Sequence, residues 1–189
     1  MKIVGSILTL CLILVPYLRA EDEYNEPEQE KGSFLMLGGG WNHDTGMTPP
    51  QGMFYNDKFY AFGRLGGFFA PVAAFYIEPS YAMLEAVPAA GRRTKTFEHF
   101  VIINPGISLK PPAWHRIYPR VDAGYDFVYH TIEGIRPNLQ DHGFNIRGAL
   151  VVNPDVFLFE ISINYLLTFT GGEHAVKLMQ VGGGAGEVY

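Results

Sequence analysis

The sequence predicts an all-β fold, an eight-stranded antiparallel up-and-down transmembrane β-barrel. Three observations lead to this prediction. Segments of about 10 to 15 residues alternate apolar and polar side chains, which is the period of a strand. There are eight such segments, and they are joined by connections of unequal length. After the first twenty residues, no apolar run approaches the roughly 20 residues of a membrane helix.

The clearest alternation is RIYPRVDAGYDFVYH, residues 116–130. One face carries Ile117, Pro119, Val121, Ala123, Tyr125, Phe127 and Tyr129, and the other carries Arg116, Tyr118, Arg120, Asp122, Gly124 and Asp126. The polar face has four formal charges, two of each sign, and burying them requires close pairing. The apolar face is therefore the one we expect to be fully dehydrated, either inside a soluble barrel or against lipid.

The chain begins with a segment typical of secretion. Residues 1–20 combine the basic Lys2 with an apolar run and end on the small Ala20, so we interpret them as a cleaved signal peptide. The only cysteine, Cys11, lies within it, and a mature chain without cysteine fits a bacterial envelope protein. Residues 21–31 hold six acidic side chains and one lysine, which predicts a flexible lead-in. Residues 32–189 remain for the barrel.

The eight predicted strands differ in how cleanly they alternate. They cover residues 33–41, 58–69, 73–85, 96–110, 116–130, 143–152, 156–170 and 174–189. The first contains three glycines, and we expect Leu35, Leu37, Gly39 and Trp41 to face outward. The seventh is as regular as the fifth, with large apolar residues at every second position from Phe157 to Phe169.

The connections between these strands carry turn-forming residues. The loops at 42–57, 87–95 and 131–142 are long and polar, whereas the turns after the second, fourth and sixth strands are short and contain proline. An even strand number with short turns at one end and longer loops at the other is typical of an outer-membrane barrel whose termini lie in the periplasm.

Lipid outside fits the side-chain sizes better than a core inside. A soluble lipocalin-like ligand carrier would turn the apolar faces inward, and an eight-stranded interior has little room for them. The opposite faces are rich in Gly, Ala, Ser and Asn. Aromatic residues near strand ends would then form interfacial girdles; the candidates are Trp41, Tyr55, Trp114, Tyr118, Tyr129 and Tyr189.

The charged residues on the polar faces are the main candidate site. They are Arg64, Glu78, Glu98, Arg120, Asp122, Asp126, Arg147 and Glu160. We expect them to form an interior network of salt bridges and hydrogen bonds that fills the barrel, because eight strands leave a lumen just wide enough for side chains. The alternative is a narrow polar pore in which arginine and carboxylate partners exchange.

The pattern FYIEPSYAML, then TFEHFVIINPGISLK, RVDAGYDF and a glycine-rich last strand resembles the small outer-membrane β-barrel superfamily. That group includes OmpA-like and OmpX-like barrels and PorT-like domains, and the resemblance covers residues 32–189. It implies that the terminal aromatic residue, Tyr189, is read by the barrel assembly machinery during insertion. Glu187 lies on the face of Tyr189 where the family usually has an apolar residue, so either the strand carries a bulge or the signal is weak.

Other motifs favour few additional functions. Arg92, Arg93 and Lys95 make one loop basic, and they are a candidate contact for lipopolysaccharide phosphates or a host polyanion, if the loop is not simply solvated. The histidines lack close ligand spacing, so we expect no metal, and we expect no cofactor.

No His-x-Ser element of the kind found in lipid A deacylases occurs, so we expect no enzyme and no catalytic residues. The net charge of −5 becomes −7 once Lys2 and Arg19 are removed, which argues against nucleic acid.

These observations predict a protein integral to the bacterial outer membrane, in contact with its lipid and lipopolysaccharide, whose extracellular loops form a structural or interaction surface. A slender channel or transport route for small, hydrophobic molecules is the alternative, and a soluble periplasmic ligand binder is the second. The oligomeric state is left open.

Overall fold

The computed structural model describes residues 32–49, 52–88, 96–111, 116–132, 136–154, 156–170 and 175–189, with the side chains of 132–138 excepted. The predicted signal peptide and acidic lead-in lie outside these residues. No helix among the described residues is long and apolar enough to cross a membrane.

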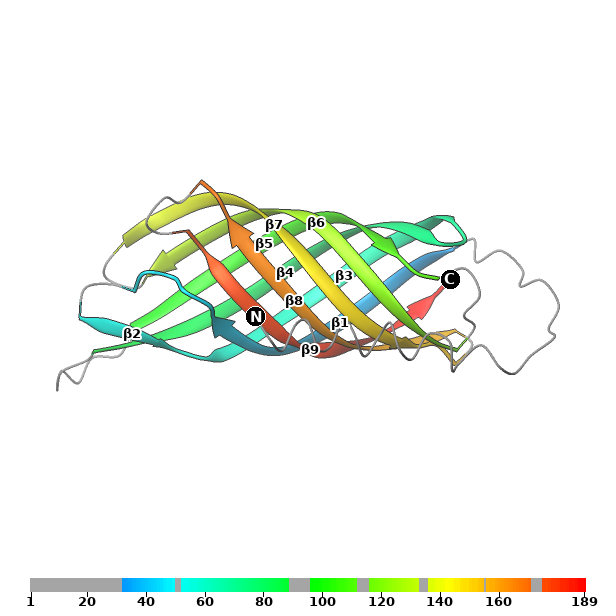
Figure 1. Ribbon diagram of the computed structural model, residues 1–189, viewed down its shortest axis with the longest axis horizontal. Coiled ribbons are helices and arrows are strands. Elements are labelled where there is room, and N and C mark those ends of the chain that lie inside the picture. Colours follow the sequence, from blue (N-terminus) through cyan, green and yellow to red (C-terminus); the bar gives the residue numbers. More distant parts are fainter. Residues whose placement is uncertain are drawn as a thin grey trace. The chain divides into compact units, whose positions relative to one another are not determined.

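The described chain forms a single antiparallel sheet that closes on itself (Figure 1). Its strands are β1 (Ser33–Asp44), β2 (Met53–Asn56), β3 (Lys58–Ala70), β4 (Ala73–Pro88), β5 (Thr96–Leu109), β6 (Ile117–Ile132), β7 (Arg136–Val152), β8 (Phe157–Thr168) and β9 (Lys177–Val188). Each long strand pairs with the next along the chain, and β1 pairs with β9 to close the barrel.

The short strand β2 does not add a ninth stave, that is, a ninth segment running the length of the barrel wall. Both β2 and β3 pair with β4, β2 through Asn56 opposite Glu85 and β3 through Tyr60 opposite Ala82. They are therefore two parts of one stave, interrupted at Asp57. The barrel has eight staves, as the sequence predicts.

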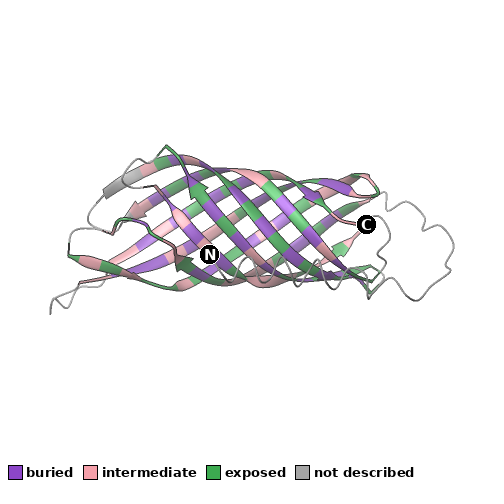
Figure 2. Ribbon diagram, in the orientation of Figure 1, coloured by how far each residue is buried: buried purple, intermediate pink, exposed green. Residues whose placement is uncertain are grey.

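Along most of the sheet, side chains alternate between the inside and the outside of the barrel, and bands of burial and exposure cross the strands (Figure 2). β4 departs from this at its two ends, where consecutive residues are buried. In β6, the predicted apolar face points outward and the charged face is buried. The first strand follows the prediction too, with Leu37 and Trp41 65% and 68% exposed. Period-two alternation arises because successive Cβ atoms of a strand point to opposite faces.

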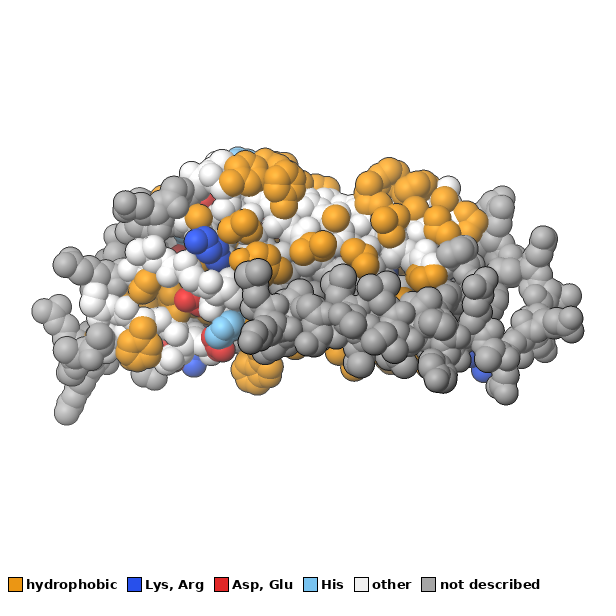
Figure 3. All heavy atoms as spheres, in the orientation of Figure 1, with side chains coloured by type: hydrophobic (Ala, Val, Ile, Leu, Met, Phe, Trp, Pro, Cys, Tyr) orange, Lys and Arg blue, Asp and Glu red, His pale blue; other side chains and the backbone are white. Residues whose placement is uncertain are grey.

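The outer wall is apolar along its length, and hydrophobic side chains gather on the described part of the face shown in Figure 3. Exposed large residues such as Phe144, Ile146 and Ile161 would face water in a soluble protein. Because the charges lie inside and these side chains lie outside, the lipocalin-like alternative is wrong. The wall suits a lipid environment.

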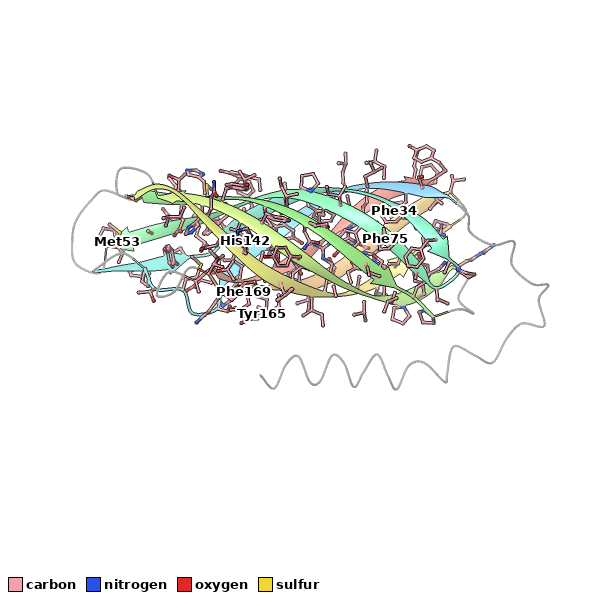
Figure 4. All side chains as sticks on the ribbon, turned by 90° about the horizontal axis from the view of Figure 1, so that it is seen from above. Phe34, Met53, Phe75, His142, Tyr165 and Phe169 are labelled. Atoms are coloured by element: carbon pink, nitrogen blue, oxygen red, sulfur yellow. The ribbon has the colours of Figure 1, made fainter. Side chains whose placement is uncertain are left out.

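Aromatic rings gather on the outer wall near both ends. Toward the loop end, Phe127 contacts His142 at a ring distance of 5.4 Å, and Phe144 contacts Phe169 at 5.3 Å. Figure 4 labels His142 and Phe169. Toward the turn end, Phe69 and Phe75 stack at 4.4 Å. These positions match the aromatic girdles of membrane barrels.

Two of the predicted girdle residues are placed differently. Tyr118 is 2% exposed inside the barrel, and the Tyr55 hydroxyl donates to the buried Glu98. Their strand positions have the parity of the interior, which outweighs the preference of tyrosine for interfaces. Trp41, Tyr129 and Tyr189 are exposed, and Trp114 lies outside the described residues.

The strands at the loop end run further than the sequence indicates. The predicted loop 131–142 is wrong, because β6 continues to Ile132 and β7 begins at Arg136. The predicted loop 42–57 contains the end of β1 and all of β2. The polar residues there do not break the ladder, because inward-facing polar side chains can bond to one another within a barrel.

These extensions make the barrel rim uneven. β4, β6 and β7 have 16, 16 and 17 residues, whereas β1, β8 and β9 have 12 each. A tilted strand needs only about 9 to 11 residues to cross the hydrocarbon layer. The loop-end parts of β2, β4, β5, β6 and β7, here called the raised rim, therefore extend past the hydrocarbon on one side (Figure 1, left).

The inner side of the β1–β9 seam is built of glycine. The inward positions there are Gly38, Gly40, Gly182, Gly184 and Gly186. The rings of Tyr60 and Phe62, from β3, stack at 5.9 Å and take up the space that these glycines leave. A Cβ at Gly38 would overlap the Phe62 ring and the carbonyl oxygen of Gly183.

We expect Gly38→Ala to destabilise the barrel by about 1–3 kcal/mol, the usual cost of overpacking. The measurement is the temperature at which the compact form is lost on an unboiled SDS gel. Gly67→Ala is the matched control, because a Cβ there meets no atom closer than 3.8 Å. Equal melting of the two variants would contradict the packing argument.

Candidate functional site

The buried charged residues meet at the middle of the barrel. Six side chains from five strands form one network, and together they carry no net charge. They are Arg64 on β3, Glu78 on β4, Arg120 and Asp122 on β6, Arg147 on β7 and Glu160 on β8. All six are at most 7% exposed.

Glu78 lies between two arginines. Its Oε2 accepts from Arg64 Nε at 2.8 Å and from Arg147 Nη1 at 2.7 Å, and its Oε1 accepts from Arg147 Nη2 at 2.5 Å. Arg64 and Glu78 are on neighbouring strands, whereas Arg147 reaches Glu78 across the lumen. One carboxylate thus ties opposite walls together.

The other half of the network is centred on Arg120. Its Nε donates to Asp122 Oδ1 at 2.8 Å and its Nη2 donates to Asp122 Oδ2 at 3.0 Å, while Nη2 also donates to Glu160. Arg64 Nη1 lies 2.9 Å from Asp122 Oδ2, which joins the two halves. The arginine forks suit this arrangement, because a guanidinium can serve two carboxylates at once.

Aromatic rings complete the surroundings of the arginines. The Arg64 guanidinium lies 4.7 Å from the centre of the Tyr76 ring, and that of Arg147 lies 5.1 Å from the Phe62 ring. Ring faces attract cations and exclude water. The network is therefore enclosed by side chains.

Asp126 forms a separate site. Its Oδ1 accepts from Asn104 Nδ2 and Asn145 Nδ2, both at 2.8 Å, and its Oδ2 has no hydrogen-bond partner among the described atoms. Asp126 is fully buried, and amides take the place of the cation that a buried carboxylate usually has.

Glu98, the last of the eight predicted interior residues, belongs to a third group near the raised rim. Its Oε1 lies 2.8 Å from His130 Nδ1, and His130 Nε2 lies 3.1 Å from Asp141 Oδ2. The His130 ring stacks on Phe100 at 5.7 Å. An imidazole with a carboxylate at each nitrogen satisfies both when it carries two protons.

Sequence reasoning missed His130, Asp141 and Tyr55 as members of this group. His130 has the parity of the charged face of β6, so continuing the alternation would have found it. Asp141 and Tyr55 were assigned to loops, where parity is not defined. Thr170 also donates to Asp141, at 3.3 Å, so the group links β2, β5, β6 and β7 to the chain after β8.

The chain after β1 covers part of the loop end. Asp44 Oδ1 accepts from the amides of Gly46 and Met47, at 3.0 and 2.7 Å, which forms a tight turn. Met47 is 8% exposed and packs into the buried hydrophobic cluster, which Val176 also joins.

Little free space is enclosed at the turn end. A cavity bordered by Phe34, Phe68, Tyr118 and Leu158 has a volume of about 10 Å³. A single water needs about that much. Lys110 closes this end, with its amine 5.0 Å from the Phe68 ring and 5.2 Å from the Tyr118 ring.

The remaining predicted site residues are the three basic residues of one loop and the terminal Tyr189. Arg92, Arg93 and Lys95 lie outside the described residues. Tyr189 is 70% exposed after β9, and its hydroxyl donates to Glu187 at 2.9 Å. β9 pairs with both neighbours without a register shift, so the described strand has no bulge and Glu187 does share the outer face with Tyr189.

No group of three or more histidine, cysteine or acidic residues in the described part of the chain is arranged to hold a metal. The Glu98, His130 and Asp141 side chains instead bond to one another.

No family model and no curated protein match this sequence. Solved structures do match the fold. Neisserial surface protein A (NspA) has a TM-score of 0.57 at 6% identity, over 85% of this chain and 97% of that chain. The outer membrane protein OprG from Pseudomonas aeruginosa has a TM-score of 0.53 at 10% identity, over 86% and 99%. The chain has the fold of the small eight-stranded outer-membrane β-barrels.

A third solved structure is the attachment invasion locus protein Ail of Yersinia pestis, in complex with the heparin analogue sucrose octasulfate. It matches with a TM-score of 0.52 at 12% identity, over 84% of this chain and 99% of that chain. None of the three proteins is named as an enzyme. At these identities the likeness defines the fold alone.

We expect Glu78→Ala to destabilise the barrel by about 3–5 kcal/mol, because it leaves two buried arginines without their shared carboxylate. The urea midpoint of the purified protein in detergent would measure this loss. Glu187→Ala is the control, since Glu187 lies exposed on the outer face. A Glu78→Ala midpoint equal to that of the control would show that the network does not hold the barrel.

Proposed function

We propose that this protein is an integral protein of the bacterial outer membrane, with its termini in the periplasm, and that its raised rim and loops form a structural or interaction surface. The observation that carries the proposal is the combination of a salt-bridged interior with strands that extend past the hydrocarbon layer. The matching solved structures are not of proteins named as enzymes, and we propose no enzymatic role.

The packing of the lumen supports this role over the narrow-channel alternative. The network of Arg64, Glu78, Arg120, Asp122, Arg147 and Glu160 joins opposite walls. A conducting path would have to break several of these contacts at once. Breaking a buried charge pair is costly, so exchange of partners is a slow route for an ion.

The raised rim supports a contact role. The loop-end parts of β5, β6 and β7 are linked by the contacts of His130 with Glu98 and Asp141, and a barrel scaffold can present loops for recognition. We further propose that lipopolysaccharide contacts the basic loop with Arg92, Arg93 and Lys95, which joins β4 to β5. The exposed Tyr189 supports recognition of the last strand by the barrel assembly machinery.

We expect purified protein in planar bilayers to show no stable conductance, because the interior is filled by paired charges. Discrete current steps that vanish when Arg120 or Glu160 is neutralised would overturn this expectation and favour the channel.

Cysteine labelling in intact cells tests the orientation. Gln140 is exposed on the loop-end part of β7, and Pro154 is exposed in the turn after β7. We expect Gln140→Cys to react with a membrane-impermeant maleimide in intact cells, and Pro154→Cys to react only after lysis. The reverse pattern would place the termini outside.

A further inference from the structure

A shallow, open hollow interrupts the bulky apolar surface of the outer wall. It has a volume of about 410 Å³ and lies over β1, β3 and β4. Its lining includes Leu37, Ala61, Gly63, Pro79, Ser80 and Tyr81.

The hollow exists because the outward positions here are small. Ala61, Gly63 and Pro79 occupy neighbouring outward sites, and the adjoining β1 and β9 add Gly39 and Ala185. Many other outward positions carry bulky residues such as Phe144 or Ile161. Pro79 also lacks an amide hydrogen, and the bridge partners of β3 and β4 skip Gly63 and Pro79.

Both ends of the hollow are bounded. Toward the turn end stand Leu65 and Ile77, which are 55% and 46% exposed. Toward the loop end stands Tyr81, whose ring contacts Phe59 at 6.1 Å. Tyr81 Oη also lies 2.5 Å from His99 Nδ1 on β5.

The hollow is therefore apolar at mid-wall and ends on a phenol and an imidazole near the loop-end girdle. This gradient matches an amphiphile, with a hydrocarbon chain along Gly63 and Pro79 and a polar head beside Tyr81 and His99. An imidazole N–H donates hydrogen bonds, which suits an anionic head group. In the orientation proposed above, the leaflet at this level is the outer one.

We propose that this hollow binds one acyl chain of lipopolysaccharide, with a lipid A phosphate near Tyr81 and His99. The inference rests on the proposed function for the orientation of the barrel. It names a lipid partner of the wall, separate from the contact proposed for the basic loop.

Gly63→Leu tests the site, because the leucine side chain would point outward and occupy the hollow. The substitution fits the barrel wall, since a Cβ at this position meets only Leu37, at 3.3 Å. Gly148→Leu is the matched control, since Gly148 is also on the outer wall and a Cβ there meets no atom within 4 Å. Both variants must first show the compact form on an unboiled gel.

The readout is the amount of lipid A retained per barrel, by native mass spectrometry, after the full-length protein is mixed with lipid A in neutral detergent and washed. We expect one molecule on the wild type and on Gly148→Leu. Gly63→Leu should retain on the order of tenfold less, which corresponds to the contribution of about two buried methylene groups.

Equal retention by Gly63→Leu and the wild type would overturn the site. Retention of phosphatidylglycerol or of palmitate in preference to lipid A, still sensitive to Gly63→Leu, would overturn the lipopolysaccharide assignment; palmitate would point to the transport alternative. If the labelling of Gln140→Cys and Pro154→Cys is reversed, the proposed orientation fails. A failure of lipid A retention with the expected labelling rejects this inference alone.

Discussion

The structure depends on the requirement that charges removed from water be paired. Arg64, Arg120 and Arg147 enter the lumen from three strands, and each finds a carboxylate within hydrogen-bond distance. Since their partners come from β4, β6 and β8, the pairing is satisfied only when β3, β4, β6, β7 and β8 have their correct register. A one-residue slip in any of these five strands would send a charge to the lipid side. The same contacts therefore set the register of these strands and fill the middle of the lumen.

The outer wall, unlike the lumen, does not depend on specific pairing between side chains. In lipid, apolar side chains need no partner, so the wall tolerates bulky residues such as Ile161 and small ones such as Gly63 alike. The aromatic rings near the two ends of the wall specify how deep the barrel sits in the membrane. The two functional surfaces proposed above are the raised rim above the loop-end girdle and the hollow, where an apolar surface meets Tyr81 and His99.

The sequence allows the faces to be predicted well and the contacts poorly. Alternation in β6 and β8 is enough to separate inside from outside, because parity is a local property of a strand. The same parity would have placed Tyr118 and His130 correctly. It does not reveal that Arg147 reaches Glu78 across the lumen, since that contact depends on the stagger of staves far apart in the chain. Nor does it reveal that polar residues near Asp141 continue a strand, because their partners, His130 and Thr170, come from other segments.

The glycines of the closing seam have a consequence for how the barrel forms. β1 and β9 are the most distant segments of the sheet in sequence, with the Ser33 amide bonded to the Tyr189 carbonyl oxygen. Bringing them together costs the most chain entropy, and such contacts tend to form late in folding. On their lumen side the two edges present bare backbone at Gly38, Gly40, Gly182 and Gly184, so no side chains have to interdigitate as they meet. The seam can therefore form one hydrogen bond after another, and in the closed barrel the rings of Tyr60 and Phe62 pack against its glycines.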